Sequence, residues 1–191
     1  ADTIYDTASL TKAVVTTTLA AMLTESGRLD LGVPVERYLP EWAGQSGDSG
    51  SRERVTVRHL LTHTSGLPAH REYFKSARTR REVLARAMAE ALEAEPGAQS
   101  VYSDIGFILL GEILERLMGQ PLDRAAHERI FAPLEMTNTM FNPPVALRPN
   151  IAPTENDTDF RKRLVRGEVH DENCWMMGGV SGHAGMFSTG G

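Results

Sequence analysis

Ser9 and Lys12 stand three residues apart in the run Ser9-Leu10-Thr11-Lys12, at the start of a segment with helical apolar spacing. Residues i and i+3 of a helix share one face, so this hydroxyl and this amine would point into the same space. Serine becomes a nucleophile when a base removes its proton, and lysine can be that base when burial or nearby positive charge lowers its pKa. The pair alone is weak evidence, because a capping serine followed by a solvated lysine has the same spacing.

A second candidate base lies in the run Tyr102-Ser103-Asp104, at the opening of the apolar helical pattern over residues 104–118. A tyrosine in this place is ordinarily a packing residue, and the serine or the aspartate is ordinarily the helix cap. Beside Ser9 and Lys12, however, the phenol could accept a proton, because an ammonium within hydrogen-bond reach favours the phenolate.

The composition is that of an ordinary globular domain. The chain has 191 residues, 41% of them hydrophobic and 24% charged, with a net charge of −5, which does not favour nucleic-acid binding. The basic run Arg161-Lys162-Arg163 is expected to lie in a solvated loop. No apolar stretch is long enough to span a membrane, and no leader opens the chain. Cys174 is the only cysteine, so no internal disulfide can form and a buried neutral thiol is expected.

Apolar spacing and capping residues predict helices over residues 8–26, 57–62, 80–92, 104–118 and 121–131. Thr56 is the expected cap of the second helix, and Gly27 and Gly119 are the expected ends of the first and the fourth. The other segments are expected to be irregular: a polar surface loop at 43–54, a Pro-rich stretch at 141–173, and a Gly-rich flexible loop near the cleft, followed by a short strand, at 178–189.

Several segments occur in an order that resembles one enzyme superfamily. Besides the Ser9 and Tyr102 segments, the matching pieces are Leu60-Leu61-Thr62-His63-Thr64-Ser65-Gly66-Leu67-Pro68, Leu109-Leu110-Gly111, Pro133-Leu134-Glu135-Met136, Val169-His170-Asp171-Glu172-Asn173 and Gly182-His183-Ala184-Gly185. This co-linear set resembles the serine β-lactamase, penicillin-binding protein and related esterase superfamily, and is closest to its class C-like branch.

The resemblance implies an α+β fold of the β-lactamase/transpeptidase type. Compared with that fold, residues 1–191 are expected to form a partial domain, truncated at both ends. It would contain the active-site helix and the helical subdomain, with most of the antiparallel sheet missing. One oxyanion donor is expected at the Ser9 N–H and the other on the missing strand. Loss of one such donor costs about 10²–10³ in rate, so these residues alone are expected to be nearly inactive.

By the same resemblance, Ser9 is the acylated nucleophile and Lys12 its partner, while Tyr102 is the general base for attack and then the acid for the leaving group. Asp104 is the expected substrate-binding residue. It occupies a position where the family more often has Asn, which bonds the substrate amide and the lysine. An aspartate favours the charged lysine, which weakens the case for amide recognition and favours an ester. Which group of the Ser/Lys/Tyr set takes the proton stays open.

The function implied is a serine hydrolase that forms an acyl-enzyme on β-lactams, D-alanyl peptides or short esters. This chemistry needs no cofactor or metal. The expected partner is a small-molecule or peptide substrate, and the oligomeric state is left open. The habit of the family favours the cell envelope or the outside of the cell.

Three alternatives remain beside this function. A penicillin-recognising or cell-wall-binding domain without turnover would keep Ser9, Lys12 and Tyr102 and differ only in its kinetics. A metallohydrolase could use His59 and His63 at i, i+4 with further ligands from His170, Asp171, Glu172 and His183, but the glutamate of the zinc-protease signature is missing. A Ser-His-Asp hydrolase around Ser181 lacks the nucleophile-elbow spacing.

Overall fold

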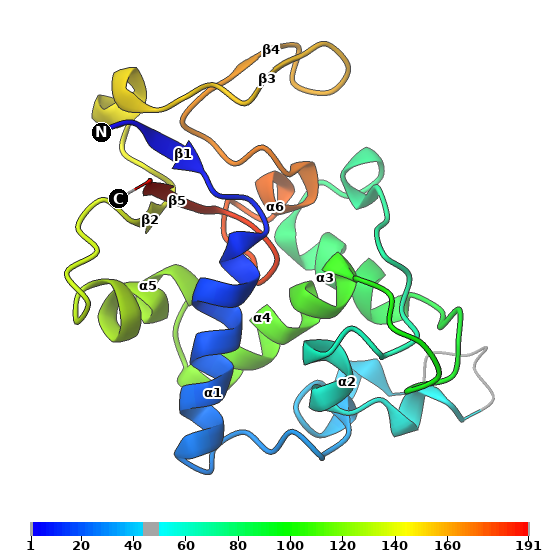
Figure 1. Cartoon of the computed structure of the whole chain (residues 1–191). Coiled ribbons are helices and arrows are strands. Elements are labelled where there is room, and N and C mark those ends of the chain that lie inside the picture. Colours follow the sequence, from blue (N-terminus) through cyan, green and yellow to red (C-terminus); the bar gives the residue numbers. More distant parts are fainter. Residues whose placement is uncertain (1, 44–49, 191) are drawn as a thin grey trace.

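The computed structural model describes residues 2–43 and 50–190. Figure 1 shows a group of helices with a small sheet at one end and a two-stranded hairpin beside it. The α-helices are α1 (Thr18–Glu25), α2 (Val57–Leu61), α3 (Arg80–Ala89), α4 (Asp104–Met118), α5 (Leu122–Ala126) and α6 (Glu172–Met176). The strands are β1 (Ile4–Asp6), β2 (Met140–Phe141), β3 (Glu155–Asp157), β4 (Arg163–Val165) and β5 (Met186–Thr189). Two π-helical segments, Lys12–Thr17 and His127–Phe131, precede α1 and follow α5.

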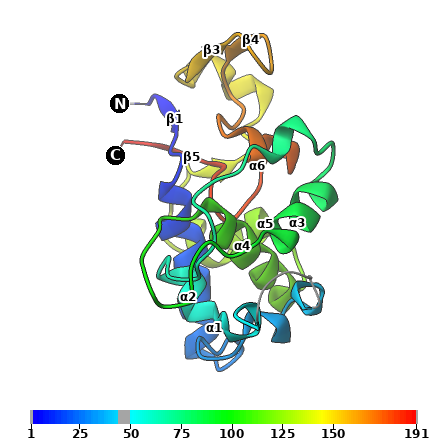
Figure 2. The same ribbon diagram turned by 90° about the vertical axis from the view of Figure 1, so that its right-hand side faces the viewer.

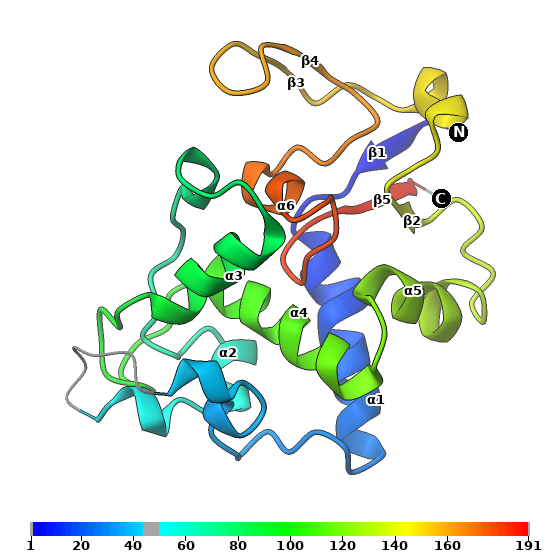
Figure 3. The same ribbon diagram turned by 180° about the vertical axis from the view of Figure 1, so that it is seen from behind.

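Helix α4 is the centre of the helical part. Nine of its fifteen residues are buried, and it contacts α2, α3, α5 and the π-helix Lys12–Thr17 (Figure 3). Its limits are those predicted from the sequence. Ser103 caps its first turn, and Gly119 ends it at φ +68°, a left-handed conformation that suits glycine. A helix so apolar must be covered on most sides, and therefore the other helices pack around it.

The small sheet joins the two ends of the described chain. Its strands are antiparallel in the order β1-β5-β2, with Asp6 opposite Phe187 and Phe187 also opposite Met140. The sheet brings the segment before Ser9 beside the segment after residue 185, which are far apart in the sequence. Helices with a small antiparallel sheet are what we expected of the helical part of the fold.

The stretch 141–173 is more regular than predicted. Strand β2 begins at Met140, a 3₁₀-helix spans Val145–Asn150, and β3 and β4 form an antiparallel hairpin. Figure 2 shows this hairpin at the end of the molecule far from α2. The hairpin also corrects one expectation, since the Arg161 side chain is only 2% exposed and pairs with Asp157 at 3.2 Å. The basic run is therefore not wholly solvated.

The polar loop predicted at 43–54 lies partly outside the described residues, which exclude 44–49. For residue 52, near the C-terminal end of this segment, the prediction of a surface position is wrong. Arg52 is buried, its guanidinium donates to the carbonyl of Met88 at 2.8 Å, and it lies 4.0 Å from the ring centroid of Trp42. The guanidinium thus pairs with a carbonyl and an aromatic face instead of with water.

Helix α4 also meets the Gly-rich segment at one close contact. A Cβ placed on Gly182 would lie 2.2 Å from the carbonyl oxygen of Phe107 and 2.9 Å from the backbone nitrogen of Gly111. Only glycine leaves room for the two backbones there. The segment that precedes β5 is therefore pressed directly onto α4.

We predict that Gly182→Ala lowers the free energy of unfolding by about 2–3 kcal/mol, because the added methyl group overlaps backbone atoms that cannot move away. Urea unfolding measures the change. Gly32→Ala is the control, since a methyl group at that position would have as its nearest neighbour a flexible Asp30 carboxylate oxygen at 3.4 Å. Equal stabilities of the two variants would contradict the close contact.

Candidate active site

Ala8 and Ser9 form a tight turn just before the helix. The backbone N–H groups of residues 10, 11 and 12 donate to carbonyls three positions back at 3.0–3.1 Å. Ala8 has φ +47°, so the prediction that the helix begins at Ala8 is wrong, and continuous helix starts at residue 10. Side chains at i and i+3 eclipse in such a 3₁₀-type turn, which brings Ser9 directly beside Lys12.

Asp6 holds this turn in place. One of its carboxylate oxygens accepts from the Ala8 N–H at 2.8 Å, and the other accepts from the His170 N–H at 2.7 Å. Burial raises the pKa of Asp6, although these N–H bonds act in the opposite direction. The carboxylate supports the left-handed backbone at Ala8 and joins it to a segment more than 160 positions away.

Lys12 is buried, with 4% of its surface exposed, whereas Ser9 is exposed. The amine nitrogen Nζ lies 2.8 Å from Ser9 Oγ, 2.7 Å from Asp104 Oδ1 and 3.1 Å from the carbonyl oxygen of His183. An ammonium has three protons to donate, and three acceptors surround this one. The structure therefore brings Ser9, Lys12 and Asp104 together, as the sequence predicted.

Asp104 is available to the lysine because another residue caps α4. Ser103 Oγ accepts from the Gly106 N–H at 3.2 Å and donates to the carbonyl of Pro68 at 2.7 Å. The second carboxylate oxygen of Asp104 lies 3.5 Å from Nδ1 of His70. The aspartate thus lies between the buried amine and a histidine at the surface.

Tyr102 lies at the same place, but its hydroxyl does not make the expected contact. Lys12 Nζ lies over the face of the phenol ring, 4.8 Å from its centroid, which is a cation–π arrangement. Among the described residues, the Tyr102 hydroxyl forms no hydrogen bond with Ser9 or Lys12. Tyr102 is 53% exposed, so the phenol lies at the surface of the site.

His63 packs against Tyr102, with ring centroids 4.5 Å apart. Its Nδ1 accepts from the Ser103 N–H at 2.9 Å, which requires an unprotonated nitrogen at that position. Burial, and then the charge of Lys12, lower the pKa of His63. His63, which begins the matching run 63–68, thus packs against the phenol ring and bonds the residue that caps α4.

The histidines considered as metal ligands have other partners. His59 Nδ1 accepts from the Thr56 N–H at 3.2 Å, which completes a capping box of α2. In residues 2–43 and 50–190 there is no group of three or more His, Cys, Asp or Glu side chains that could hold a metal ion.

Within the same ranges, no helix combines the length and the apolar character that crossing a membrane requires.

The Gly-rich segment was expected to be a flexible loop, and this is wrong. Ser181 and His183 are 2% and 1% exposed. Ser181 Oγ lies 2.8 Å from His183 Nδ1, and His183 Nε2 lies 2.9 Å from Asp171 Oδ1. The three side chains of a Ser-His-Asp arrangement are therefore joined, but the serine is closed to substrate.

Two further groups complete this region. Burial alone would raise the pKa of Asp171, but the charge and hydrogen bond of His183 and the Cys174 N–H outweigh it and lower the pKa well below the usual range. Burial raises the pKa of the Cys174 thiol well above its usual value, and its Sγ lies 3.2 Å from the carbonyl of Ala184. The expectation of a buried neutral thiol is confirmed.

A cavity of about 210 Å³ lies beside the exposed serine. Its lining residues come from the nucleophile turn, the hairpin region and the Gly-rich segment: Asp6, Ala8, Ser9, Thr154, Val169, His170, Asp171, His183 and Ala184. The cavity therefore opens next to the exposed Ser9 side chain.

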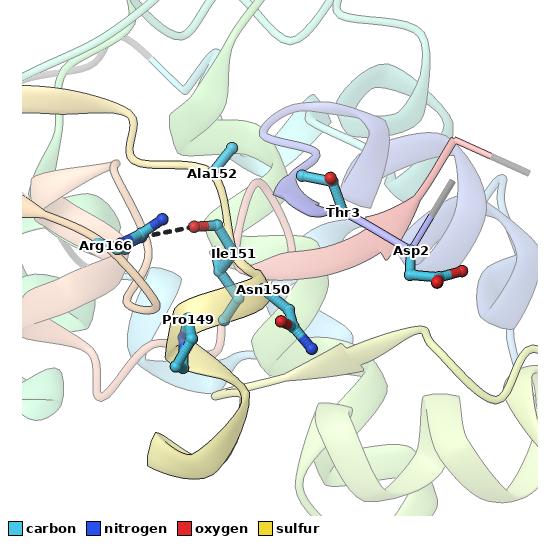
Figure 4. Close-up of a pocket in the computed structure, with 7 residues that line it drawn as sticks. All are labelled: Asp2, Thr3, Pro149, Asn150, Ile151, Ala152 and Arg166. Atoms are coloured by element: carbon cyan, nitrogen blue, oxygen red, sulfur yellow. Dashed lines mark hydrogen bonds between the residues drawn. The ribbon is translucent and has the colours of Figure 1, made fainter.

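A larger hollow of about 350 Å³ lies around the N-terminal end of β1 (Figure 4). Asp2 and Thr3 line it together with Pro149–Ala152 and Arg166, whose Nε donates to the carbonyl of Ile151 at 2.7 Å. It contains none of Ser9, Lys12, Tyr102 and Asp104, so we give it no part in the site.

Sequence reasoning missed four residues that support the site: His63, His70, Asp171 and His183. The signal for three of them was present, because His63, Asp171 and His183 all lie in segments that match the class C-like branch. None of the three could be given a role, since only the folded chain shows what their side chains contact.

Comparison with known proteins agrees with this geometry. The family model described as Beta-lactamase matches residues 1–191, the whole chain. The fold is β-lactamase-like, and the chain belongs to the β-lactamase family.

Individual relatives are similar over nearly the whole chain. A protein of Escherichia coli (strain K12) named "Putative D-alanyl-D-alanine carboxypeptidase" is 35% identical, and the match covers 98% of this chain and 48% of the relative. A class C β-lactamase structure is 26% identical with a TM-score of 0.77, covering 98% and 48%. A D-stereospecific amidohydrolase from Streptomyces sp. is 28% identical with a TM-score of 0.71, covering 97% and 57%.

We predict that Asp171→Asn destabilises the protein by about 1–2 kcal/mol more at pH 7 than at about pH 3. The native pKa of Asp171 is lowered, so its contribution is fully present above the unfolded value of about 3.9 and is lost as the pH falls toward the native value. Urea unfolding of both proteins at the two pH values gives the difference. Asp2→Asn, at an exposed position, is the control, and an equal loss at both pH values would contradict the assignment.

Proposed function

We propose that the protein containing these residues is a serine hydrolase that forms an acyl-enzyme on Ser9. The observation that carries the proposal is the contact of 2.8 Å between the exposed Ser9 hydroxyl and the buried Lys12 amine. An exposed hydroxyl can meet a substrate carbonyl, and a buried amine is held at a fixed distance from it.

In the proposed reaction, Ser9 Oγ attacks the carbonyl carbon of the substrate and loses its proton. Lys12 faces the Asp104 carboxylate at 2.7 Å, and an amine that is paired in this way as ammonium stabilises negative charge at Ser9 Oγ instead of accepting the proton. We therefore assign proton transfer to Tyr102, which in its phenolate form takes the proton that Ser9 Oγ loses and so becomes the neutral phenol. Tyr102 then returns the proton to the leaving group, and water hydrolyses the ester on Ser9.

The proposal concerns a larger protein than these 191 residues, because the chain spans about half the length of the curated relatives it matches. Ser9 supplies one oxyanion donor, its own N–H at the start of the helix, and we propose that a second comes from outside these residues. The substrate classes proposed are β-lactams, D-alanyl peptides and short esters. We also propose, from the family alone, a location in the cell envelope or outside the cell.

The competing proposal is a protein that is acylated on Ser9 and does not turn over. It uses the same side chains, so geometry does not separate it from a hydrolase. Release of the acyl group separates the two proposals. Repeated turnover of substrate supports the hydrolase, and one stable adduct per chain supports the binding role.

We predict that a fluorescent penicillin gives one covalent adduct, on the peptide that contains Ser9, and that Ser9→Ala abolishes it. Intact-mass spectrometry with peptide mapping measures this on the protein that contains the chain. Ser26→Ala, which removes another serine hydroxyl beyond the end of α1, is the control and should label like the wild type. Labelling that survives Ser9→Ala would rule out the proposed nucleophile.

Asp104→Asn is predicted to raise the ratio of amide to ester hydrolysis about tenfold in kcat/KM. The new amide can donate to a substrate carbonyl, and one hydrogen bond of about 1.4 kcal/mol corresponds to that factor. Rates with nitrocefin and with p-nitrophenyl acetate give the ratio. In Asp104→Ala, which offers no donor, both rates should fall without a rise in the ratio. An unchanged ratio in Asp104→Asn would remove Asp104 from substrate selection.

A further inference from the structure

The segment that precedes β5 is attached to the helix that carries Lys12. The carbonyl of Gly182 accepts from Thr16 Oγ1 at 2.6 Å, and the carbonyl of His183 accepts from Lys12 Nζ at 3.1 Å. On its other side, the same segment lies against α4 at Gly182. The His183 carbonyl is thus one of the three acceptors of the buried amine, and its direction depends on the backbone of residue 183.

The His183 side chain is held by hydrogen bonds beside that carbonyl. Both ring nitrogens are engaged, Nδ1 with Ser181 Oγ and Nε2 with Asp171 Oδ1, and the ring is 1% exposed. Asp171 is itself fixed, because the same oxygen accepts from the Cys174 N–H at 2.7 Å and caps α6. A ring that is held at both nitrogens restrains the Cα atom of residue 183, to which the carbonyl carbon is bonded.

We propose that Asp171, His183 and Ser181 are positioning residues for Lys12. Their buried network holds the His183 carbonyl where it accepts a hydrogen bond from one N–H of the ammonium. The other two N–H groups can then donate to Ser9 and Asp104. If the carbonyl turns away, one donor of a buried ammonium has no acceptor and the amine leaves its place beside Ser9. The inference deepens the proposed function and rests on it.

The same three residue types form the nucleophilic triad of other hydrolases, but here the arrangement has a different use. Ser181 is 2% exposed, so no substrate carbonyl can reach its hydroxyl. What the network does contact, through the backbone of His183, is the amine beside the exposed Ser9. The structure thus assigns it to support of the exposed nucleophile.

The test compares His183→Ala and His183→Gln with Ser188→Ala in the protein that contains the chain. Ser188 is a matched control because its hydroxyl lies 2.7 Å from Thr139 Oγ1, on β5, away from Lys12. Single-turnover reaction with nitrocefin separates the acylation rate constant from the binding constant. We expect His183→Ala to lower the rate constant on the order of 10²-fold with little change in binding, and Ser188→Ala to change it less than about twofold.

His183→Gln is the conservative variant. Its side-chain amide can reach the place of Nε2 and donate to Asp171, so we expect it to recover part of the acylation rate constant. A fall in rate that is as large in Ser188→Ala as in His183→Ala would show general loosening of the fold and would overturn the proposal.

A second measurement does not depend on catalysis. Competitive acetylation with peptide mapping reports how available each lysine amine is, and Lys75, which is exposed, is the internal reference. We expect labelling of Lys12 relative to Lys75 to rise about tenfold in His183→Ala, because this factor corresponds to the loss of one charge-assisted hydrogen bond. In Ser188→Ala the relative labelling should stay unchanged. Unchanged labelling in folded His183→Ala would overturn the proposal. A wild type without an adduct on Ser9, together with responsive labelling, would overturn the proposed function and leave the positioning role standing.

Discussion

A buried ammonium is the constraint on which this structure depends. Lys12 is 4% exposed, and an amine at such a place is tolerated only if its protons find acceptors. The acceptors come from three parts of the chain: Ser9 from the preceding turn, Asp104 from the start of α4, and the His183 carbonyl from the segment before β5. These parts must pack correctly on one another before the serine and the lysine can meet.

The packing of the backbone around α4 therefore places the groups that bind the Lys12 amine. Glycine at position 182 lets the segment before β5 lie against α4, and capping by Ser103 leaves the Asp104 carboxylate for the lysine. On the open side, the exposed hydroxyl of Ser9 faces solvent near the small cavity that it helps to line. The protein side of the site is buried and charged, and Ser9 on the other side is exposed.

The sequence predicted what local signals control. Helix α4 has both of its predicted ends, because the Ser103 cap, the apolar stripe and Gly119 all act within a few residues. The turn before Lys12 was predicted as an α-helix, and it is not one because Asp6 bonds both Ala8 and the distant His170. The Gly-rich segment looked flexible by composition, but Asp171 lies ten positions before Ser181 and only the fold brings the two to opposite sides of His183.

We propose that Lys12 is held in place to activate Ser9. A crystal structure of the protein after reaction with a β-lactam tests this without mutation. We expect a covalent bond from Ser9 Oγ, with the Lys12 amine still within hydrogen-bond distance of that oxygen, of Asp104 and of the His183 carbonyl. A covalent bond to any other side chain, or a lysine turned away from an acylated Ser9, would contradict it.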